Sequence, residues 1–366
     1  MQLDVDKADL RHVRAVARPS PALEPGEARL RIDTFGLSAN NITYAVYGEV
    51  MQYWACFPGS VEDGVAWGRI PVWGFGDVVE SASPALDEGR RVYGYFPMGD
   101  ELVVSPGRFD EQGFSDTAPS RSAVPSVYGR YGFTDADRIY RPDREPQQML
   151  LWPLFVTSFV VDDFLGDHGF YGAGTAIVSS ASSKTAVGAA FLVGARDGID
   201  VVGLTSPANV GFVRSLGCYD SVLTYDEVDD LPTADACYID VAGRRDVTHH
   251  VHTRLAAHLR YSTVVGDTHW DEHAVGDGVL PGPRPEFLFA PDQIAKRRSD
   301  WGRDGFEAAV AAAWDRFLPF TDGWLALRRR TGPDEVGAAY RDLLDGRVDP
   351  STGDVCTLAG DPRGAP

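Results

Sequence analysis

Hydrophobic and polar residues follow two different patterns along the chain, and the change comes near residue 150. Before it, short apolar runs alternate with polar residues, as in 28–38, where Leu30 and Ile32 share one face. A period of two is typical of a half-buried strand. The segments 72–81 and 90–96 are similar and contain glycines at expected bends. We therefore expect a β-rich domain in the first part of the chain.

One long segment of this first part lacks the alternation. Residues 109–147 are polar and rich in proline. An irregular segment of this length in a compact protein is usually functional or forms a lid. We therefore expect an irregular insertion in the β-rich domain.

After residue 150, apolar strands alternate with helical sequence, which indicates a parallel sheet in an α/β fold. Strands are expected at these segments: 174–178, 199–207, 220–225, 234–243 and 262–268. The helix expected at 306–325 places Phe306, Val310, Trp314 and Phe317 on one face. A second helix is expected at 333–346, and a terminal strand at 348–358.

Charge and cysteine content narrow the classes of function. The chain has 34 Lys and Arg against 53 Asp and Glu, so its net charge is 34 − 53 = −19. This charge would repel nucleic acids and anionic membranes, so neither is an expected partner. No apolar run approaches the ~20 residues of a membrane span, and the start of the chain lacks an apolar signal segment. The four scattered cysteines match neither a disulfide framework nor a zinc knuckle, so we expect a cytoplasmic protein.

The strongest chemical signal is the segment 178–190, where a strand turns into a helix through small residues. Such a turn directs backbone N–H groups and the positive end of the helix toward a phosphate. Ala181 and Ala186 stand where the dinucleotide fingerprint needs small residues, and Ser183 replaces its close-approach glycine. The candidate ligands of a nucleotide are Ser182, Ser183, Lys184 and Thr185. The alternative is an ordinary turn between a strand and a helix.

The end of the next strand suggests which nucleotide would bind. NAD sites usually have an acidic residue there, which binds the ribose hydroxyls. Here Thr205 and Ser206 occupy the position, and hydroxyls accept a 2′-phosphate that an acid would repel. We therefore expect NADP(H) as the cofactor. Tyr225 is a possible neighbour of the 2′-phosphate, or else an aromatic residue at a strand end.

In several segments the sequence resembles the medium-chain dehydrogenase/reductase superfamily, in its zinc-free, quinone oxidoreductase-like branch. Residues 25–48 and 70–95 resemble the GroES-like catalytic domain, and 151–165 resembles the helix that leads into the nucleotide domain. Residues 212–227 and 238–243 resemble later motifs of the nucleotide domain. The turn SSASSKTA and the insertion are similar to a subfamily known only as a domain of unknown function.

The resemblance implies a fold class and a division into domains. The fold is α/β, with a GroES-like β-rich domain and a Rossmann domain with a doubly wound parallel sheet. The expected ranges are 1–155 for the catalytic domain with its insertion, 156–318 for the Rossmann domain, and 319–366 for a return to the catalytic domain. The branch also commonly forms homodimers through an edge strand, for which residues 285–291 are the candidate.

The positions that hold zinc in related enzymes carry no suitable ligands here. Ser38, Phe75, Gly76, Trp152 and Pro153 stand where cysteine, histidine or glutamate would be found. The resemblance therefore implies an enzyme without metal, in which hydrogen-bond donors polarise the substrate.

The resemblance also points to residues around the nicotinamide and the substrate. The candidate catalytic residues are Tyr44, Asn41 and Tyr128, with Tyr44 first because a tyrosine can donate to an enolate oxygen. The candidate substrate-binding residues are Tyr53, Trp54, Tyr131, Arg121, His269 and Trp270, and Thr157 and Thr268 are candidates beside the nicotinamide. The alternative for each aromatic residue is simple packing.

Together these features favour an oxidoreductase that transfers hydride from NADPH to an activated C=C bond or a quinone, with a small molecule as its partner. Two alternatives remain open. The fold could serve a non-redox lyase, isomerase or cyclase step, or it could be a binding scaffold. The histidines at 249, 250 and 252 are expected on a surface helix, and the basic segment 296–303 is expected in a solvated turn or an interface.

Overall fold

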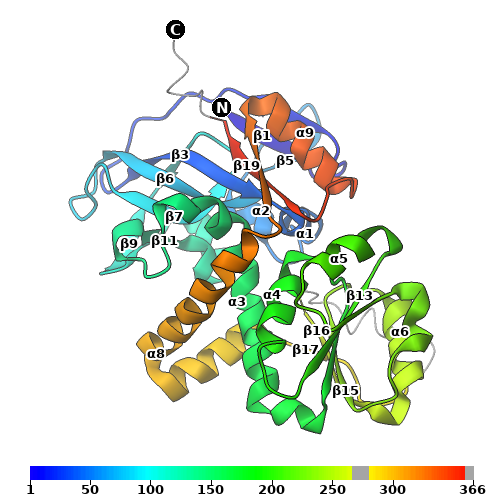
Figure 1. The fold of residues 1–366 in the computed structure, drawn as a ribbon. Helices are drawn as coiled ribbons and strands as arrows, with labels where there is room; N and C mark the ends of the chain where they lie inside the picture. The colour runs from blue at the N-terminus through cyan, green and yellow to red at the C-terminus, as the bar shows by residue number, and fades with distance from the viewer. Residues whose placement is uncertain (266–279, 359–366) are drawn as a thin grey trace. The chain divides into compact units, whose positions relative to one another are not determined.

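The computed structural model describes residues 1–265 and 280–358, and the chain divides into two compact units. Unit 1 combines Met1–Leu150 with Leu325–Pro366, and unit 2 is Leu151–Trp324 (Figure 1). The exchange points therefore lie a few residues away from the boundaries at 155 and 318 that the sequence suggests.

Unit 1 contains two sheets. The larger one has the order β18-β19-β3-β6-β7-β11-β10-β9, with β8 also paired to β3. Its strands are β3 (Ala28–Leu37), β6 (Pro71–Ser81), β7 (Arg91–Pro97), β8 (Glu101–Val104), β9 (Pro106–Asp110), β10 (Gly113–Asp116), β11 (Arg130–Phe133), β18 (Ala326–Thr331) and β19 (Thr352–Thr357). The smaller sheet, β2-β1-β5-β4, consists of β1 (Gln2–Asp6), β2 (Val13–Val16), β4 (Val61–Glu62) and β5 (Val65–Gly68). Strands β3, β6 and β7 confirm three predicted strands.

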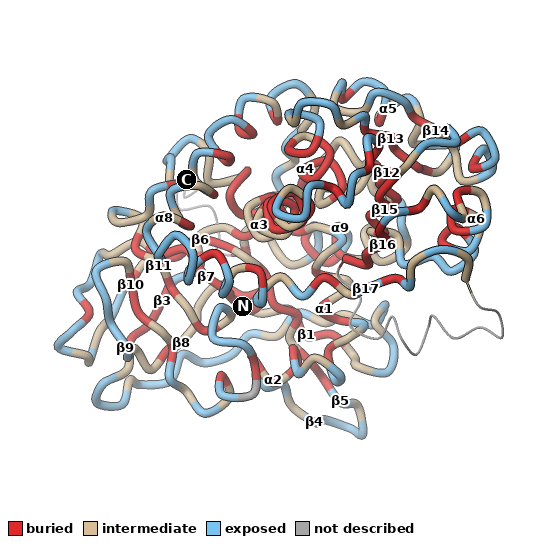
Figure 2. Tube along the Cα trace, turned by 90° about the horizontal axis from the view of Figure 1, so that it is seen from below, coloured by how far each residue is buried: buried red, intermediate tan, exposed pale blue. Residues whose placement is uncertain are grey.

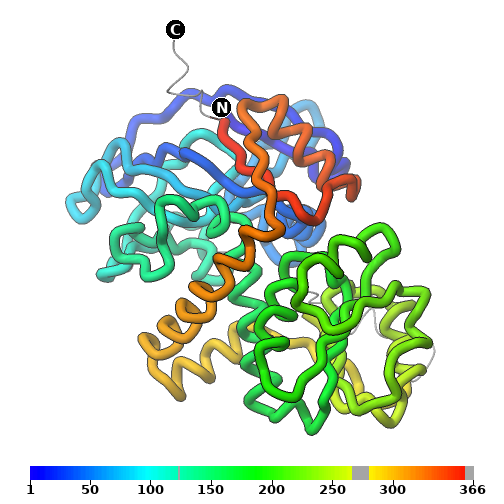
Figure 3. Tube along the Cα trace, in the orientation of Figure 1, coloured from blue at the N-terminus to red at the C-terminus, as the bar shows by residue number. Residues whose placement is uncertain are grey.

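Both ends of the chain contribute to unit 1. Strand β19 pairs antiparallel with β3, so that Cys356 lies opposite Phe35, and Figure 3 shows the red end of the chain among the blue strands. The helices of this unit are α1 (Ala39–Val46), α2 (Tyr53–Cys56) and α9 (Gly332–Leu344). Val336 and Tyr340 of α9 are fully buried in the same core as Phe35.

The prediction of an irregular insertion at 109–147 is wrong. Strands β9, β10 and β11 continue the large sheet beyond β7, and all three junctions are antiparallel. Phe114 and Tyr131 from these strands are fully buried and stack 5.3 Å apart between ring centroids. The segment is therefore part of the core of unit 1. The strands have only four or five residues each and many polar positions, so no clear alternation marks them.

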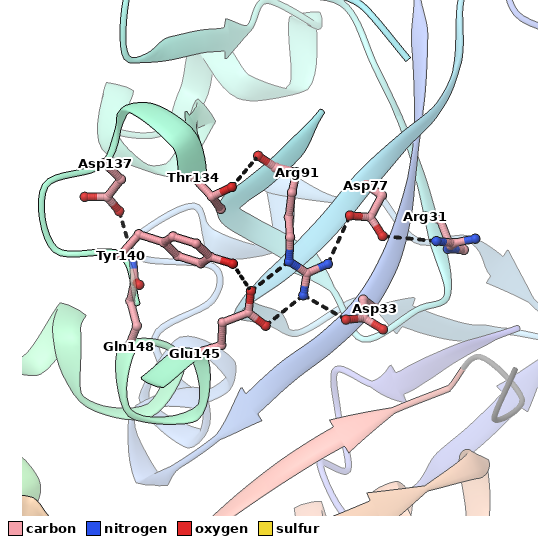
Figure 4. A network of polar contacts seen from close by, with 9 residues as sticks. All are labelled: Arg31, Asp33, Asp77, Arg91, Thr134, Asp137, Tyr140, Glu145 and Gln148. Atoms are coloured by element: carbon pink, nitrogen blue, oxygen red, sulfur yellow. Dashed lines mark hydrogen bonds and ion pairs between the residues drawn. The ribbon is translucent and has the colours of Figure 1, made fainter. Parts of the chain in front are cut away.

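Arg91 on β7 joins the sheet to the start of α3 (Glu145–Asp167). Its guanidinium donates to both oxygens of Glu145 at 2.7 Å, to Asp33 at 2.8 Å and to Asp77 at 3.0 Å (Figure 4). Tyr140 donates a further hydrogen bond to Glu145. Because the group is half-buried, these ion pairs fix where α3 begins relative to β3, β6 and β7.

Unit 2 is a six-stranded parallel sheet with the order β14-β13-β12-β15-β16-β17. Its strands are β12 (Thr175–Val178), β13 (Asp200–Thr205), β14 (Ser221–Thr224), β15 (Ala236–Asp240), β16 (Leu259–Val264) and β17 (Glu286–Phe287). In sequence order this is 3-2-1-4-5-6, the order of the doubly wound Rossmann fold. The edge strand expected at 285–291 is only two residues long, because a helix begins at Ala290.

Both faces of the parallel sheet are buried, and Figure 2 shows its strands as buried. Ala176 and Val178 contact α3 (Glu145–Asp167) and α4 (Lys184–Val193), whereas Ile177 between them contacts α6 (Arg245–Leu255). The remaining helices of this unit are α5 (Val210–Ser215) and α8 (Ala290–Thr321). Burial on both faces explains why the strands read as continuous apolar runs.

Helix α8 contains the basic segment 296–303, which is exposed as predicted except at Arg297, but the segment is helical and the prediction of a turn is wrong. Gly302 has φ +74°, outside the helical region, so two helical segments of α8 meet there at a kink. Arg297 is buried and donates to Asp163 of α3 at 2.6 Å. The acidic partner on α3 is distant in sequence, so the local pattern did not reveal this pairing. Phe306, Val310, Trp314 and Phe317 are buried on one face, as predicted.

One helical stretch, 142–167, is long and apolar enough to cross a membrane by length and composition alone. Of its apolar window, 61% is buried, which is equally typical of the core helix of a folded protein. The stretch includes five aspartates or glutamates that pair with arginines, namely Asp143, Glu145, Asp162, Asp163 and Asp167. It therefore offers no argument for a membrane span.

Candidate functional site

The parallel sheet of unit 2 reverses its winding between β12 and β15. The two strands are neighbours, and helix α4 follows the first while α6 follows the second. Their carboxyl ends are at Val178 and Asp240. In doubly wound sheets, ligands bind outside the carboxyl ends of the strands at this point.

Side-chain hydrogen bonds connect the two loops at this switch point. Ser179 donates to the buried Asp240 carboxylate at 2.7 Å and accepts from the N–H groups of Val241 and Ala242 at 2.9 Å. The second oxygen of Asp240 accepts from Thr248 at 2.8 Å. The turn after β12 is therefore held in place before any ligand arrives.

The turn itself depends on small residues and an unusual backbone conformation. Ser180 has φ +50°, in the left-handed region, and its N–H donates to the Tyr225 hydroxyl at 3.2 Å. Ala181 is fully buried, and a Cβ on Gly203 of β13 would lie 3.0 Å from its methyl group. Tyr219 donates to the Ala181 carbonyl at 2.9 Å. Larger side chains at 181 or 203 would separate the turn from β13.

The predicted nucleotide ligands 182–185 lie at the start of α4. Ser183 is the N-cap and accepts from the Ala186 N–H at 3.3 Å. The Ser182 hydroxyl accepts from the Asn209 amide at 2.9 Å. Lys184 and Thr185 occupy the first helical turn, so the structure brings all four residues to the positive end of one helix.

Thr205 and Ser206 lie at the carboxyl end of β13, next to this turn. Thr205 is 1% exposed, and its hydroxyl has no hydrogen-bond partner among the described residues. Strand β13 is followed by Ser206 and the short 3-10 helix 207–209, and none of these residues carries a carboxylate. The Tyr225 hydroxyl accepts from the Ser180 N–H of the turn. Burial raises the pKa of Tyr225, and this N–H opposes the shift.

Sequence reasoning missed Arg244, which follows the loop after β15. Its guanidinium lies 5.0 Å from the centre of the Tyr225 ring and pairs with Asp246. It is the cationic side chain that the structure adds to the predicted set near Ser180. The pair Arg244-Arg245 after the glycine of the loop was the available signal.

One further predicted cofactor residue lies on α3. Thr157 of α3 donates weakly to the Pro153 carbonyl at 3.5 Å, whereas Ser158 donates to the Thr185 carbonyl at 2.7 Å and so connects α3 to α4. Thr268, His269 and Trp270 lie outside the described residues.

Unit 1 contains a cluster of aromatic side chains, which we call the tyrosine cluster. Its members are Tyr44, Tyr53, Trp73, Tyr95 and Tyr128. Ring centroids of Tyr44 lie 4.8 Å from Tyr53 and 5.4 Å from Tyr95, and Tyr95 lies 4.8 Å from Tyr128. The cluster brings together three predicted site residues, from α1, α2 and the insertion.

The Tyr44 hydroxyl has hydrogen-bond donors on two sides. It accepts from the Asn40 amide at 2.7 Å and from the Trp73 indole N–H at 3.2 Å. With two N–H donors on its oxygen, the hydroxyl directs its own hydrogen elsewhere. Burial raises the pKa of Tyr44 above its ordinary value, and the two N–H donors oppose this shift. The group is therefore a neutral hydrogen-bond donor at physiological pH.

The other hydroxyls of the cluster are only partly satisfied. Those of Tyr53 and Tyr128 lie 3.4 Å apart, and burial raises both pKa values. The Tyr95 hydroxyl has no hydrogen-bond partner within 3.5 Å among the described residues. It is close enough to Tyr44 to oppose the rise in the Tyr44 pKa. The cluster can thus offer several O–H groups to a polar group of a ligand.

Four predicted site residues have structural roles instead. Asn41 accepts from the Ser38 N–H at 2.8 Å and donates to the Pro71 carbonyl at 2.9 Å, which uses both ends of its amide to fix the start of α1. Trp54 packs in the main core, 5% exposed. Tyr131 is fully buried and donates to the Tyr95 carbonyl at 2.7 Å.

Arg121 is the fourth. Its guanidinium donates to Asp116 and to the Cys56 carbonyl, both at 2.8 Å, and lies 4.0 Å from the centre of the Phe57 ring. These contacts hold the insertion against α2. The sequence suggested that Arg121 binds a substrate, because a partner 65 residues away, the Cys56 carbonyl, is invisible to a local pattern.

Among residues 1–265 and 280–358, no group of three or more His, Cys, Asp or Glu side chains could hold a metal ion. Of the three clustered histidines on α6, His250 pairs with Asp229, and His252 is fully buried. His252 accepts from Ser262 and donates to the Pro281 carbonyl, both at 2.9 Å. The helix is as predicted, but His252 is not a surface residue.

The fold and the switch-point turn define the class of protein, and comparisons with solved structures agree. The quinone oxidoreductase of Coxiella burnetii has a TM-score of 0.56 at 15% identity, over 97% of this chain and 98% of that one. CurA of Vibrio vulnificus gives 0.55 at 14%, over 95% and 94%. The Haloferax mediterranei glucose dehydrogenase, solved with NADP, Zn and gluconolactone, gives 0.55 at 12%, over 98% and 99%. The protein has the fold of the medium-chain dehydrogenase/reductase superfamily.

The chain belongs to the family described as Protein of unknown function (DUF2855), whose model matches residues 35–349. A search among curated proteins found no match to this sequence.

Proposed function

We propose that this protein is a metal-independent oxidoreductase that transfers hydride from NADPH to an activated C=C bond or a quinone. The observation that carries the proposal is the turn at the switch point of the parallel sheet. It joins four residues at the start of α4 to hydroxyl side chains at the end of β13, with no carboxylate there. Solved proteins with this fold include one in complex with NADPH and one in complex with NADP.

The residues at this turn fit a phosphorylated dinucleotide. The N–H groups at the start of α4, with Ser182, Ser183, Lys184 and Thr185, would hold the pyrophosphate. The hydroxyls of Thr205 and Ser206 would donate hydrogen bonds to the 2′-phosphate. The Thr205 hydroxyl is buried and lacks a partner among the described residues. Tyr225 and Arg244 would flank it, and a guanidinium suits the two negative charges of a phosphate.

NADPH would supply the hydride and the substrate would supply the electrophilic carbon, so the protein must stabilise the oxygen that gains charge. In unit 1, Tyr44 is the residue best suited to this task, because its hydroxyl oxygen already accepts two N–H bonds. Tyr53 and Tyr128 add further donors. A proton from a side chain or from water then completes the reduction, and no metal is needed for these steps.

A second candidate is a non-redox lyase, isomerase or cyclase reaction on the same fold. Its support is that the protein itself uses parts of the turn. The Ser180 N–H is taken by Tyr225, and the Ser182 hydroxyl is taken by Asn209. In this case the nucleotide would be absent or unconsumed, while the tyrosine cluster would still act on the substrate.

Calorimetry with NADPH and NADH, followed by turnover assays with enones and quinones, separates the two candidates. We expect NADPH to bind and to be oxidised, and Tyr44→Phe to lower kcat by about 100-fold or more while NADPH affinity is kept. Tyr340→Phe is the matched control, because it removes a buried, unpartnered hydroxyl elsewhere in unit 1 among the described residues.

Three outcomes contradict the proposal. If the wild type binds neither nucleotide, hydride transfer is excluded and the non-redox candidate takes its place. Equal losses in both tyrosine variants would show that Tyr44 acts only through stability. One tightly bound zinc per chain, found by elemental analysis, would contradict metal independence.

A further inference from the structure

The smaller sheet of unit 1 carries a group of arginines around one carboxylate, far in sequence from the switch-point turn. Asp4 on β1 lies opposite Arg14 on β2, and both side chains point to the same face of the sheet. Arg18 follows β2, and Arg69 follows β5. We call Asp4, Arg14, Arg18 and Arg69 the arginine cluster.

The Asp4 carboxylate is the fixed centre of this cluster. Its side chain is completely buried and accepts from Arg18 at 2.9 Å and from Arg14 at 3.3 Å. The Nε atom of Arg69 lies 3.6 Å from its other oxygen, too far for a hydrogen bond. Three guanidinium groups therefore share one negative charge.

The three arginines differ in how far their donors are used. Arg14 also donates to Glu62 at 2.6 Å and stacks 3.9 Å above the Trp67 ring, so the protein itself engages it on several sides. Arg18 makes one hydrogen bond, and Arg69 makes none with the described residues. Their side chains are 35% and 20% exposed, so both side chains are partly open to solvent.

The charge of the cluster is unbalanced. The three arginines face Asp4 and Glu62, which leaves 3 − 2 = +1 in a chain of net charge −19. The pKa of Arg69 is lowered by burial and then by the positive charge of Arg18, and Asp4 only partly opposes this. Two like charges are thus held close together, an arrangement that a bound anion would relieve.

Unsatisfied polar atoms also concentrate here. Thirteen buried side-chain nitrogen or oxygen atoms in the described residues lack a hydrogen-bond partner, and five belong to this one region. They are atoms of Gln2, Asp4, Arg14, Trp67 and Arg69. Four of the five are N–H donors. Buried polar groups are normally paired, so such a concentration of donors indicates a site that is completed by a polar ligand or by ordered water.

We propose that Arg18 and Arg69 form a binding site for an oxyanion, the phosphate or carboxylate group of a small molecule. Asp4 holds the two guanidinium groups in place, and Arg14, clamped by Glu62 and Trp67, supports Asp4. The planar N–H forks of two arginines match the oxygen pairs of either anion. The site is independent of the proposed hydride transfer, because every residue in it belongs to unit 1 and none belongs to the nucleotide turn or the tyrosine cluster.

Calorimetric titration with inorganic phosphate, at an ionic strength kept constant with chloride, tests this site directly. We expect phosphate to bind the wild type, and Arg18→Gln to weaken the affinity by about tenfold or more, because one charge-assisted pair is lost. Arg69→Gln should act likewise, and Arg18→Lys should retain part of the affinity. Acetate in place of phosphate decides whether a carboxylate also binds.

Two control variants separate this site from other effects. Arg31→Gln removes an exposed arginine from another ion pair of unit 1, and Lys184→Gln removes the cation of the nucleotide turn. Arg31→Gln should not change the phosphate affinity, and Lys184→Gln should not change the part of the binding that Arg18→Gln removes. If Arg69→Gln does not fold, the more exposed Arg18 variants decide. The proposal is wrong if the wild type binds no phosphate, if Arg18→Gln binds it as tightly as the wild type, or if only Lys184→Gln loses it.

Discussion

Replacing Arg121 by methionine should destabilise unit 1 without changing the binding of substrate. The Arg121 side chain is 5% exposed, and that of its partner Asp116 is 2% exposed. Methionine fills most of the same volume but removes the charge, so the variant leaves a buried carboxylate without its counter-ion. The prediction separates the structural role found here from the substrate-binding role that the sequence suggested.

The magnitude follows from the geometry of the pair. At 2.8 Å and an effective dielectric constant of about 20, the Coulomb attraction is about 6 kcal/mol, much of it offset by desolvation. Breaking such a pair typically costs about 3–5 kcal/mol. Asp116 keeps two backbone donors, the N–H groups of Ser105 and Ala118. We therefore expect a loss near the lower end, about 3 kcal/mol.

Urea unfolding followed by near-ultraviolet circular dichroism measures this loss. The double variant Asp116→Asn/Arg121→Met should recover much of it, because it leaves no buried charge and the asparagine oxygen can still accept from the two N–H groups. A loss below about 1 kcal/mol, together with a raised KM, would refute the reasoning and return Arg121 to the substrate site.

Three further predictions concern the nucleotide, the pH dependence and the assembly. Ser206→Asp should shrink or reverse a preference for NADPH over NADH of about tenfold, measured by calorimetry, because a carboxylate repels the 2′-phosphate and accepts from the ribose hydroxyls. Burial lowers the pKa of His252, so the unfolded chain binds more protons at this histidine than the folded chain does. Urea titrations should therefore show the free energy of unfolding falling as the pH drops below about 6.5, and this dependence should be weaker in His252→Gln. We also propose that the chain forms a homodimer through the edge strand β17, and light scattering that gives the monomer mass at micromolar concentration would exclude it.

The sequence predicts the parallel sheet well because its four central strands, β12, β13, β15 and β16, are short apolar runs that are mostly buried. The small-residue turn in 178–190 pointed correctly to Ser182–Thr185 at the start of one helix. Tyr44, Tyr53 and Tyr128 were selected as separate candidates, and the structure brings them into one cluster. The sequence did not reveal the contacts that engage Arg121 and Asn41. Arg121 pairs with Asp116 and with the distant Cys56 carbonyl. Asn41 acts locally at the start of α1, although its type and position suggested a catalytic donor.

The basic segment of α8 and the insertion show the same limit. Arg297 is stabilised by Asp163 on α3, and the short strands β9 to β11 form only because β7 offers them an edge. Local propensity is a weak guide for segments of four or five residues, because tertiary pairing overrides it. The arginine cluster was missed for a different reason, because its three arginines are isolated in the sequence and have no spacing that indicates a site.

The pairing of the last strand with β3 has a consequence for how the protein is made on the ribosome. Strand β3 ends at Leu37 and its neighbour β19 begins at Thr352, so 352 − 37 − 1 = 314 residues are synthesised between them. At about 5–20 residues per second, this edge of β3 waits roughly 15–60 s for its partner. All strands of the parallel sheet have emerged before β19 exists, so unit 2 can complete its fold while unit 1 is still unfinished. During that interval the nascent chain exposes an unpaired strand edge, which is where a chaperone would be expected to bind.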